Sequence, residues 1–185
     1  SCTPTDQVIR ELAGPGPASR RVLCSAFHVD YWDHLGWKDP YASAAFTQRQ
    51  RAYAASLKDD RVYTPQAAVN RATGFVGSDR RQLTESIHPP PAPPPAPPIA
   101  AAVAEPIKPG QTLALTVKLT PAGQSPLPAD LRVFAPPTED RLTSRITRGE
   151  NSGRELKHDA VCRALVDARP DAAGAARLEL AVPAN

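Results

Sequence analysis

The residues best suited to chemistry lie in one short segment, Phe27–Tyr41, which reads FHVDYWDHLGWKDPY. Two histidines and two acids fall within seven of its residues: His28, Asp30, Asp33 and His34. Imidazole and carboxylate groups together can bind a divalent metal, or act as a base and the group that orients it. Their spacing matches no known ligand signature, so we assign no metal. A metal site, a hydrogen-bonded structural loop and a substrate-contacting surface all stay open.

Aromatic residues of the same segment are natural contacts for a ligand. Tyr31, Trp32 and Trp37 are among the nine aromatic residues that precede residue 89, out of ten in the chain. An indole ring is too large and apolar to stay wholly in water, yet its N–H needs a partner. We therefore expect at least one tryptophan to be mostly buried and to wall a pocket near Pro65.

The three cysteines indicate no disulfide framework. Cys2, Cys24 and Cys162 are an odd number without metal-type spacing, so no disulfide pattern can be read from them. Cys24 lies in an apolar run and Cys162 follows Val161. Both fit buried thiols that act as small hydrophobic residues.

Patterns in the first half of the chain predict the elements that position these residues. Polar residues around Pro4 predict a helix that begins near Thr3. The apolar run Arg21–Val29 is typical of a buried strand. The segment Phe27–Tyr41, which we call the aromatic segment, begins at the end of this strand, where open α/β sheets place their sites. Further patterns predict a helix capped by Ser43, short strands at 62–63, 66–70 and 73–76, and a helix at 80–87.

A proline-rich segment divides the chain. Residues 89–98 (PPPAPPPAPP) predict an extended spacer of about 30 Å; a plain linker and a ligand for a proline-reading domain both stay open. Beyond it, residues 112–119 alternate as a β-strand does, and residues 159–167 show a helical pattern. We expect a domain at 1–88, a linker at 89–99 and a β-rich domain at 100–185.

The composition of the second half does not favour a hydrophobic core of its own. It holds one aromatic residue, Phe134, and many alanine, proline and arginine residues. Small domains are marginally stable even with good cores. We therefore expect the β-rich domain to dock on the first domain.

Composition and charge exclude several classes of protein. The chain has 185 residues, of which 22 are proline, and a net charge of +3. Because the charge forms no basic face or tail, we expect neither nucleic acid nor an anionic membrane as a partner. No apolar run reaches the roughly 18 residues of a transmembrane helix. No signal peptide begins the chain, so we expect either a processed mature protein or a fragment.

Several long motifs give the chain a family resemblance. FHVDYWDHLGWKDPYAS is followed by FTQRQRAYA, VYTPQAAVN and GFVGSDR, and TRGENSGRELKHDAV lies beyond the proline-rich segment. Together they resemble the bacterial family catalogued as domain of unknown function 1223. The resemblance implies a thioredoxin-like fold and a periplasmic or secreted location. We therefore expect an α/β, thioredoxin-like domain without its N-terminal strand, then the spacer and the β-rich C-terminal domain.

The resemblance also implies roles for individual residues. Family members carry Cys-x-x-Cys before the first helix. Cys2 corresponds to the second cysteine, which makes it the catalytic residue that resolves a mixed disulfide. Cys2 alone cannot complete a dithiol cycle. The Thr64–Pro65 bond corresponds to a cis-proline position, which would present the backbone of Thr64 to a bound peptide.

In a thioredoxin-like fold, a central strand precedes the first helix. Only Ser1 precedes Cys2 in this sequence. We therefore expect Arg21–Val29 to lack its parallel neighbour, which would leave a gap between it and the strand at 66–70.

A polar loop in the second half is a candidate second part of the site. Residues 148–154 (RGENSGR) contain glycines that permit a tight turn. The loop is either a plain surface loop or part of a composite site. In the second interpretation, Glu150, Asn151, Arg154 and His158 pack near residues 30–37.

Three functions stay open, and whether the chain is an enzyme is open with them. The first is a thiol–disulfide oxidoreductase of the cell envelope, truncated at its motif. The second is a non-redox module that binds a peptide or small ligand. The third is a metal-handling protein, although we assign no metal and no cofactor. The expected partner is a protein or small-molecule substrate. The substrate-binding residues are His28, Asp30, Tyr31, Trp32, Trp37, Thr64 and Pro65.

Overall fold

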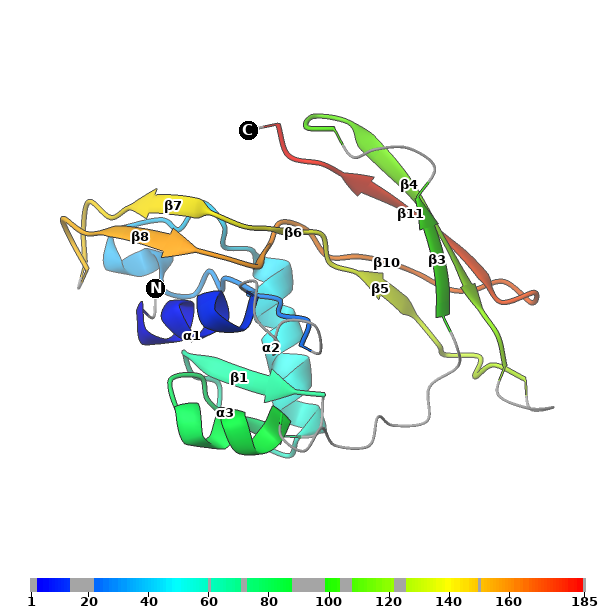
Figure 1. Cartoon of the computed structure of the whole chain (residues 1–185), viewed down its shortest axis with the longest axis horizontal. Helices are drawn as coiled ribbons and strands as arrows, with labels where there is room; N and C mark the ends of the chain where they lie inside the picture. Colours follow the sequence, from blue (N-terminus) through cyan, green and yellow to red (C-terminus); the bar gives the residue numbers. More distant parts are fainter. Residues whose placement is uncertain are drawn as a thin grey trace. The chain divides into compact units, whose positions relative to one another are not determined.

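The computed structural model describes residues 3–13, 22–59, 61–70, 73–87, 99–103, 108–121, 126–149 and 151–184. These residues form three α-helices, one 3-10 helix and eleven strands (Figure 1). The helices are α1 (Thr3–Ala13), η1 (Asp33–Leu35), α2 (Ala44–Ser56) and α3 (Arg80–Ile87). The strands are β1 (Gln66–Val69), β2 (Thr73–Val76), β3 (Ile99–Val103), β4 (Thr112–Leu119), β5 (Val133–Ala135), β6 (Thr138–Glu139), β7 (Leu142–Arg145), β8 (Glu155–His158), β9 (Val161–Cys162), β10 (Val166–Ala168) and β11 (Ala175–Ala181).

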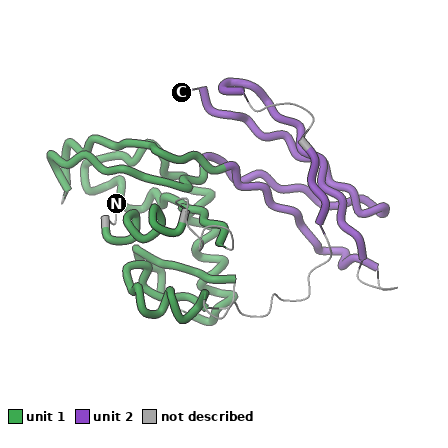
Figure 2. Tube along the Cα trace, viewed as in Figure 1, with its two compact units in different colours: residues 1–93, 138–162 green, residues 94–137, 163–185 purple. Residues whose placement is uncertain are grey.

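The chain folds into two compact units (Figure 2). Unit 1 comprises Ser1–Pro93 and Thr138–Cys162, and unit 2 comprises Pro94–Pro137 and Arg163–Asn185. The segment 138–162 therefore belongs with the first half of the chain, whereas we expected residues 100–185 to form one domain. The docking of that domain stays a prediction.

Local sequence explains the helices of unit 1. The Ser43 hydroxyl accepts a hydrogen bond from the backbone N–H of Ala45 at 3.2 Å and so caps α2. An Asp79 carboxylate oxygen accepts one from the Gln82 N–H at 2.9 Å at the start of α3. In α1, Val8 is buried, with 5% of its surface exposed. These helices confirm the ones predicted near Thr3, after Ser43 and at 80–87.

β1 and β2 form an antiparallel hairpin in which Ala67 lies opposite Phe75. Phe75 is buried and anchors the hairpin in unit 1. Asn70, which follows β1, has a φ of +49°. Asn tolerates this left-handed region better than most residues. The hairpin confirms the two short strands predicted at 66–70 and 73–76.

Residues 138–162 return to unit 1 as two small sheets, in which β7 pairs with β8 and β6 with β9. β9 meets the segment after α1 at one parallel bridge, between Ala26 and Val161. The Ala26 N–H donates to the Ala160 carbonyl at 2.7 Å, and its carbonyl accepts from the Cys162 N–H at 2.8 Å. Val161 and Cys162 are fully buried there.

An ion pair fastens α1 to the returning segment. The Arg10 guanidinium donates to the Asp159 carboxylate at 2.8 Å and to the Lys157 carbonyl at 2.9 Å. The other Asp159 oxygen accepts from the Arg141 N–H at 3.0 Å. Burial of Asp159 raises its pKa, but the hydrogen bonds from Arg10 and Arg141 outweigh this and hold the pKa below its usual value.

Unit 2 is built on one antiparallel sheet in the order β11-β4-β3. β4 alternates as its sequence predicted, with Val117 and Leu119 buried. Ala176 and Leu178 of β11 complete this cluster of buried residues. β5 and β10 pair separately, and residues of both strands pack against the cluster.

The prediction of a thioredoxin-like α/β fold is wrong for this structure. The described residues are mostly β, with eleven strands in five small sheets, all paired antiparallel, and only three α-helices. No parallel sheet flanked by helices is present among them. The apolar run at 21–29 led to this error. A strand needs strand partners along its length, and among the described residues of this run only Ala26 pairs with another strand. The one other backbone contact that we find in the described part of the run is with a loop, since the His28 carbonyl accepts from the Ser43 N–H at 3.1 Å.

Two smaller expectations also differ from the structure. Residues 159–167 form β9 and part of β10 instead of a helix, because their backbone groups pair with β6 and β5. Residues 62–63 form no strand. Among the described residues, none of the helices combines the length and the apolar character needed to span a bilayer.

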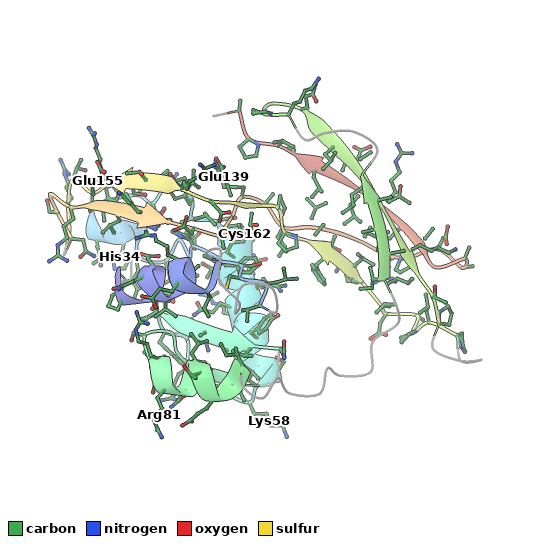
Figure 3. The ribbon with its side chains drawn as sticks, viewed as in Figure 1. His34, Lys58, Arg81, Glu139, Glu155 and Cys162 are labelled. Carbon is green, nitrogen blue, oxygen red and sulfur yellow. The ribbon has the colours of Figure 1, made fainter. Side chains whose placement is uncertain are left out.

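A double-mutant cycle tests the link between α1 and the returning segment. Arg10→Ala and Asp159→Asn should show a coupling of about 1 kcal/mol in unfolding free energy, near the upper end for exposed pairs, because Asp159 is only 13% exposed. Arg81→Ala and Glu85→Ala give the matched control, since this pair is exposed on α3 and Arg81 points outward (Figure 3). Its coupling should be about 0.3 kcal/mol. Additive effects of the first pair, measured by denaturant unfolding, would contradict the assignment of Asp159 to this role.

Candidate functional site

Unit 1 contains a cavity of about 820 Å³. This volume lies within the roughly 300–1,000 Å³ of small-molecule sites. The cavity is lined by α1, α2, α3, β1, the segment 22–29, the aromatic segment and residues 146–151. Every lining residue belongs to unit 1, so the cavity is formed by one compact body.

Apolar side chains from three helices line one part of the cavity. Val8 and Leu12 come from α1, Leu83 and Ile87 from α3, and Phe46 from α2. An ion pair between Arg80 of α3 and Glu11 of α1 holds these two helices together, with a guanidinium nitrogen 2.9 Å from a carboxylate oxygen. These walls suit an apolar ligand or the apolar side chains of a peptide.

The aromatic segment meets the cis-proline turn at another part of the cavity. The Trp32 indole N–H donates to the Thr64 hydroxyl at 2.9 Å. Trp32 remains 47% exposed, whereas Trp37 is partly buried. Both tryptophans line the cavity together with Thr64 and Pro65, whose peptide bond is cis. The structure thus brings together four residues that the sequence analysis assigned to substrate binding.

His28 and Asp39 form a partly buried pair at the cavity wall. His28 Nδ1 lies 2.7 Å from an Asp39 carboxylate oxygen, and the two side chains are only 11% and 14% exposed. The other Asp39 oxygen accepts from the Tyr41 N–H at 2.9 Å. Burial raises the pKa of Asp39, but the hydrogen bond from His28 and its charge outweigh this and hold the pKa below its usual value.

His158 lies behind this pair and is 1% exposed. Its ring lies edge-on to His28, with 5.1 Å between centroids. Its Nε2 lies 3.1 Å from the Ser144 hydroxyl, and its Nδ1 lies 3.5 Å from an Asp6 carboxylate oxygen. Ser144 and His158 are buried and do not line the cavity, whereas Asp6 is partly exposed and does. The contacts of His158 therefore hold β7 and β8 against α1, and only Asp6 faces the cavity.

The other predicted site residues have different surroundings. The Thr47 hydroxyl donates to the Asp30 carboxylate, which fastens the aromatic segment to α2. The Tyr31 hydroxyl donates to Gln50 at 3.1 Å. Neither Asp30 nor Tyr31 lines the cavity. Among the described residues, no three His, Cys, Asp or Glu side chains are grouped as a metal site would require.

The polar loop of the returning segment is only partly at the cavity. Asn151 lines it, together with Arg148, and a Cβ on Gly149 would lie 3.7 Å from the Leu35 carbonyl. Arg154 lies outside the lining, where its guanidinium reaches Asn151 at 3.4 Å. Cys2 and Glu150 lie outside the described residues.

Sequence reasoning missed Asp39, Asp6 and Arg148. Asp39 sits in the aromatic segment, eleven residues after His28, and an acid near a histidine was the available signal. Asp6 is one of the polar residues near Pro4 that predict the start of the first helix, and that pattern gives no signal for its contact with His158. Arg148 faces the cavity because the chain returns to unit 1, which no local pattern shows.

Replacement of Asp39 tests the pair that it forms with His28. Asp39→Asn should lower the unfolding free energy at pH 7 by about 2 kcal/mol, the size of a hydrogen bond to a charged group. Because the folded pKa of Asp39 is depressed, its contribution is present above the ordinary carboxyl pKa of about 4 and is lost as the pH falls through the folded value. The gap between wild type and variant should therefore close in acid.

Tryptophan fluorescence reports this unfolding, since Trp32 and Trp37 both lie in unit 1. Asp130→Asn, in an exposed turn of unit 2, is the control and should leave the transition unchanged. A gap between wild type and Asp39→Asn that stays constant down to pH 2 would show that this carboxylate does not stabilise unit 1 through its charge.

Comparison with known proteins finds one solved structure with a similar fold and one matching family. A protein of Agrobacterium tumefaciens, whose structure was solved by X-ray crystallography, is similar with a TM-score of 0.60 and 22% identity. The match covers 97% of this chain and 72% of that protein. None of the curated proteins has a significant sequence match to the chain. The family model described as "Protein of unknown function (DUF1223)" matches residues 1–185, and the chain therefore belongs to that family.

Proposed function

We propose that unit 1 is a binding module that holds an apolar ligand or peptide in its cavity. The cavity itself carries the proposal, since it combines apolar walls from three helices with a few polar groups at one part. This combination is typical of ligand sites, in which apolar walls supply affinity and polar groups fix orientation. The Trp32–Thr64 hydrogen bond positions two of those groups.

The thiols of the described residues do not favour redox chemistry. Cys24 lines the cavity, and burial, together with the nearby charge of Asp140, raises its pKa. A thiol with a raised pKa is a poor nucleophile at neutral pH. Cys162 is fully buried. Of the three cysteines in this sequence, Cys2 is thus the one that remains as a candidate for thiol–disulfide oxidoreductase chemistry. That function stays a prediction, as does a periplasmic or secreted location.

A fluorescent dye tests the proposal. Anilinonaphthalene sulfonate brightens when it enters an apolar site and should bind the whole chain. Ala67→Phe places a ring at the cavity wall and should weaken binding roughly tenfold or more. Ala52→Phe, on an exposed position of α2 outside the lining, should leave the affinity unchanged.

A cooperative thermal transition in both variants shows that they are folded. Equal affinities of the two variants, or no dye binding by the wild type, would refute the proposal. The same titration with Cys2→Ser separates binding from thiol chemistry, because a binding module keeps its affinity without this residue.

A further inference from the structure

The sheet of unit 2 ends in a strand that has one unpaired edge in the described structure. β3 pairs with β4 alone among the described strands, since the strand order is β11-β4-β3 (Figure 1). We infer that this edge is a self-association surface, at which β3 pairs antiparallel with β3 of a second copy of this chain. The inference goes beyond the proposed function, because it concerns unit 2 and the cavity belongs to unit 1.

The direction of the backbone groups in β4 shows which groups of β3 are used within the sheet. The Leu119 N–H donates to the Gly174 carbonyl at 2.8 Å, on the side of β11. The backbone groups of successive residues point to opposite edges of a strand. Those of Lys118 and Thr116 therefore point to β3.

The same register identifies the groups of β3 that point to the free edge. Lys118 and Thr116 lie opposite Ala100 and Ala102, which therefore bond to β4. The backbone groups of the three alternate residues point the other way. These residues are Ile99, Ala101 and Val103.

A second copy of β3 matches this edge. When two β3 strands pair antiparallel about a two-fold axis at Ala101, Ile99 lies opposite Val103 of the second copy. Every residue whose groups point outward then meets another such residue, and each of these pairs can exchange two hydrogen bonds. Because the axis is perpendicular to the sheet, the same face of β3 stays on the same side in both copies.

The apolar face of the sheet is uncovered at β3. Ile99 lies opposite Leu119, and Ala101 lies opposite Val117; residues opposite each other in a sheet share a face. Leu119 and Val117 are 2% and 3% exposed, whereas Ile99 is 65% exposed, and Ala101 is exposed as well. The residues of β5 and β10 that pack on Leu119 and Val117 thus leave β3 open. A second copy adds an apolar strand beside this open strip.

Residues 99–103 lack the features that keep edge strands apart. Natural proteins protect such edges with lysine, proline or a β-bulge, among other means. This strand reads IAAAV and pairs with β4 without a break in register. Lys118, which lies beside it on β4, donates to the Ala173 carbonyl. An edge without charge, whose free groups match its own, favours a second copy over a charged partner.

Cover from within the same chain is the competing explanation. The strand that the sequence analysis expects to be missing belongs between residues 21–29 and 66–70, which lie in unit 1, so it does not account for the edge of β3. Any cover from within the chain would leave the protein monomeric. Because a contact of five residues is small, the dimer should be weak, as interfaces below about 1,200 Å² are.

Sedimentation velocity of the full chain, from low micromolar to near-millimolar concentration, tests the inference and should show a monomer–dimer equilibrium. Ala101→Pro removes an N–H at the free edge and keeps the bonds of β3 to β4. It should weaken association roughly tenfold or more. Ala181→Pro is the matched control, because Ala181 lies on β11, the other outer strand, with its N–H pointing away from β4. This variant should associate as the wild type does.

Disulfide trapping tests the register in a Cys2→Ser, Cys24→Ser background, in which the remaining Cys162 is fully buried. Ala101→Cys should form a linked dimer under mild oxidation, because residue 101 lies opposite itself with Cα atoms about 5.5 Å apart. Ala100→Cys should cross-link much more slowly. Its partner in the second copy is residue 102, and the two residues 100 lie diagonally, about 7–8 Å apart.

A chain that stays monomeric at every concentration would refute the inference. A dimer that Ala101→Pro leaves intact, or that Ala181→Pro dissociates, would place the interface elsewhere and refute it as well. A cooperative thermal transition confirms that both proline variants are folded, and the cysteine variants decide the matter if one is not. Equal cross-linking at residues 100 and 101 would contradict the register. Dye binding by unit 1 is a separate measurement, so the proposed function and this inference can fail independently.

Discussion

The two backbone hydrogen bonds of Ala26 hold together parts of unit 1 that are far apart in the sequence. They join the segment after α1 to Ala160 and Cys162, and the adjoining residues, Val161 and Cys162, are fully buried. The same bonds set the orientation of the chain on either side. The backbone groups of Ala26 point to the returning segment, so those of its neighbours Ser25 and Phe27 point to the opposite edge. Close to the bridge, the ring of His28 lies edge-on to the buried ring of His158. One bridge thus sets the position of the two histidine rings and of one wall of the cavity.

Patterns within a short stretch of sequence predicted the local elements of this structure. Ser43 and Asp79 begin their helices as capping residues do, and the alternation in β4 gives a strand with one buried side. The fold class was wrong because it depends on which strands pair. An apolar run such as 21–29 has the same pattern whether it has two neighbours or a single bridge. The pairings that decide the question, above all with the segment 138–162, come from residues with no local signal for each other.

Sequence reasoning found the part of the candidate site that lies in the aromatic segment. Trp32 and Trp37 were chosen for their aromatic rings, and they meet Thr64 and Pro65 at the cavity. Asp30 was chosen for its carboxylate, but that carboxylate is used to hold the segment on α2. Charge alone could not separate it from Asp39, which pairs with His28. What distinguishes the two acids is their distance from an imidazole in space, and residue type and spacing do not give that distance.

Alkylation of Cys24 during a titration with anilinonaphthalene sulfonate tests the central claim most directly. The account predicts that bound dye slows the alkylation of Cys24 in a Cys2→Ser background, because Cys24 lines the cavity of unit 1. The rate should fall over the same dye concentrations at which the fluorescence rises. Cys162 is fully buried and should stay unreacted in the folded protein. An alkylation rate of Cys24 that does not change at saturating dye would contradict the account.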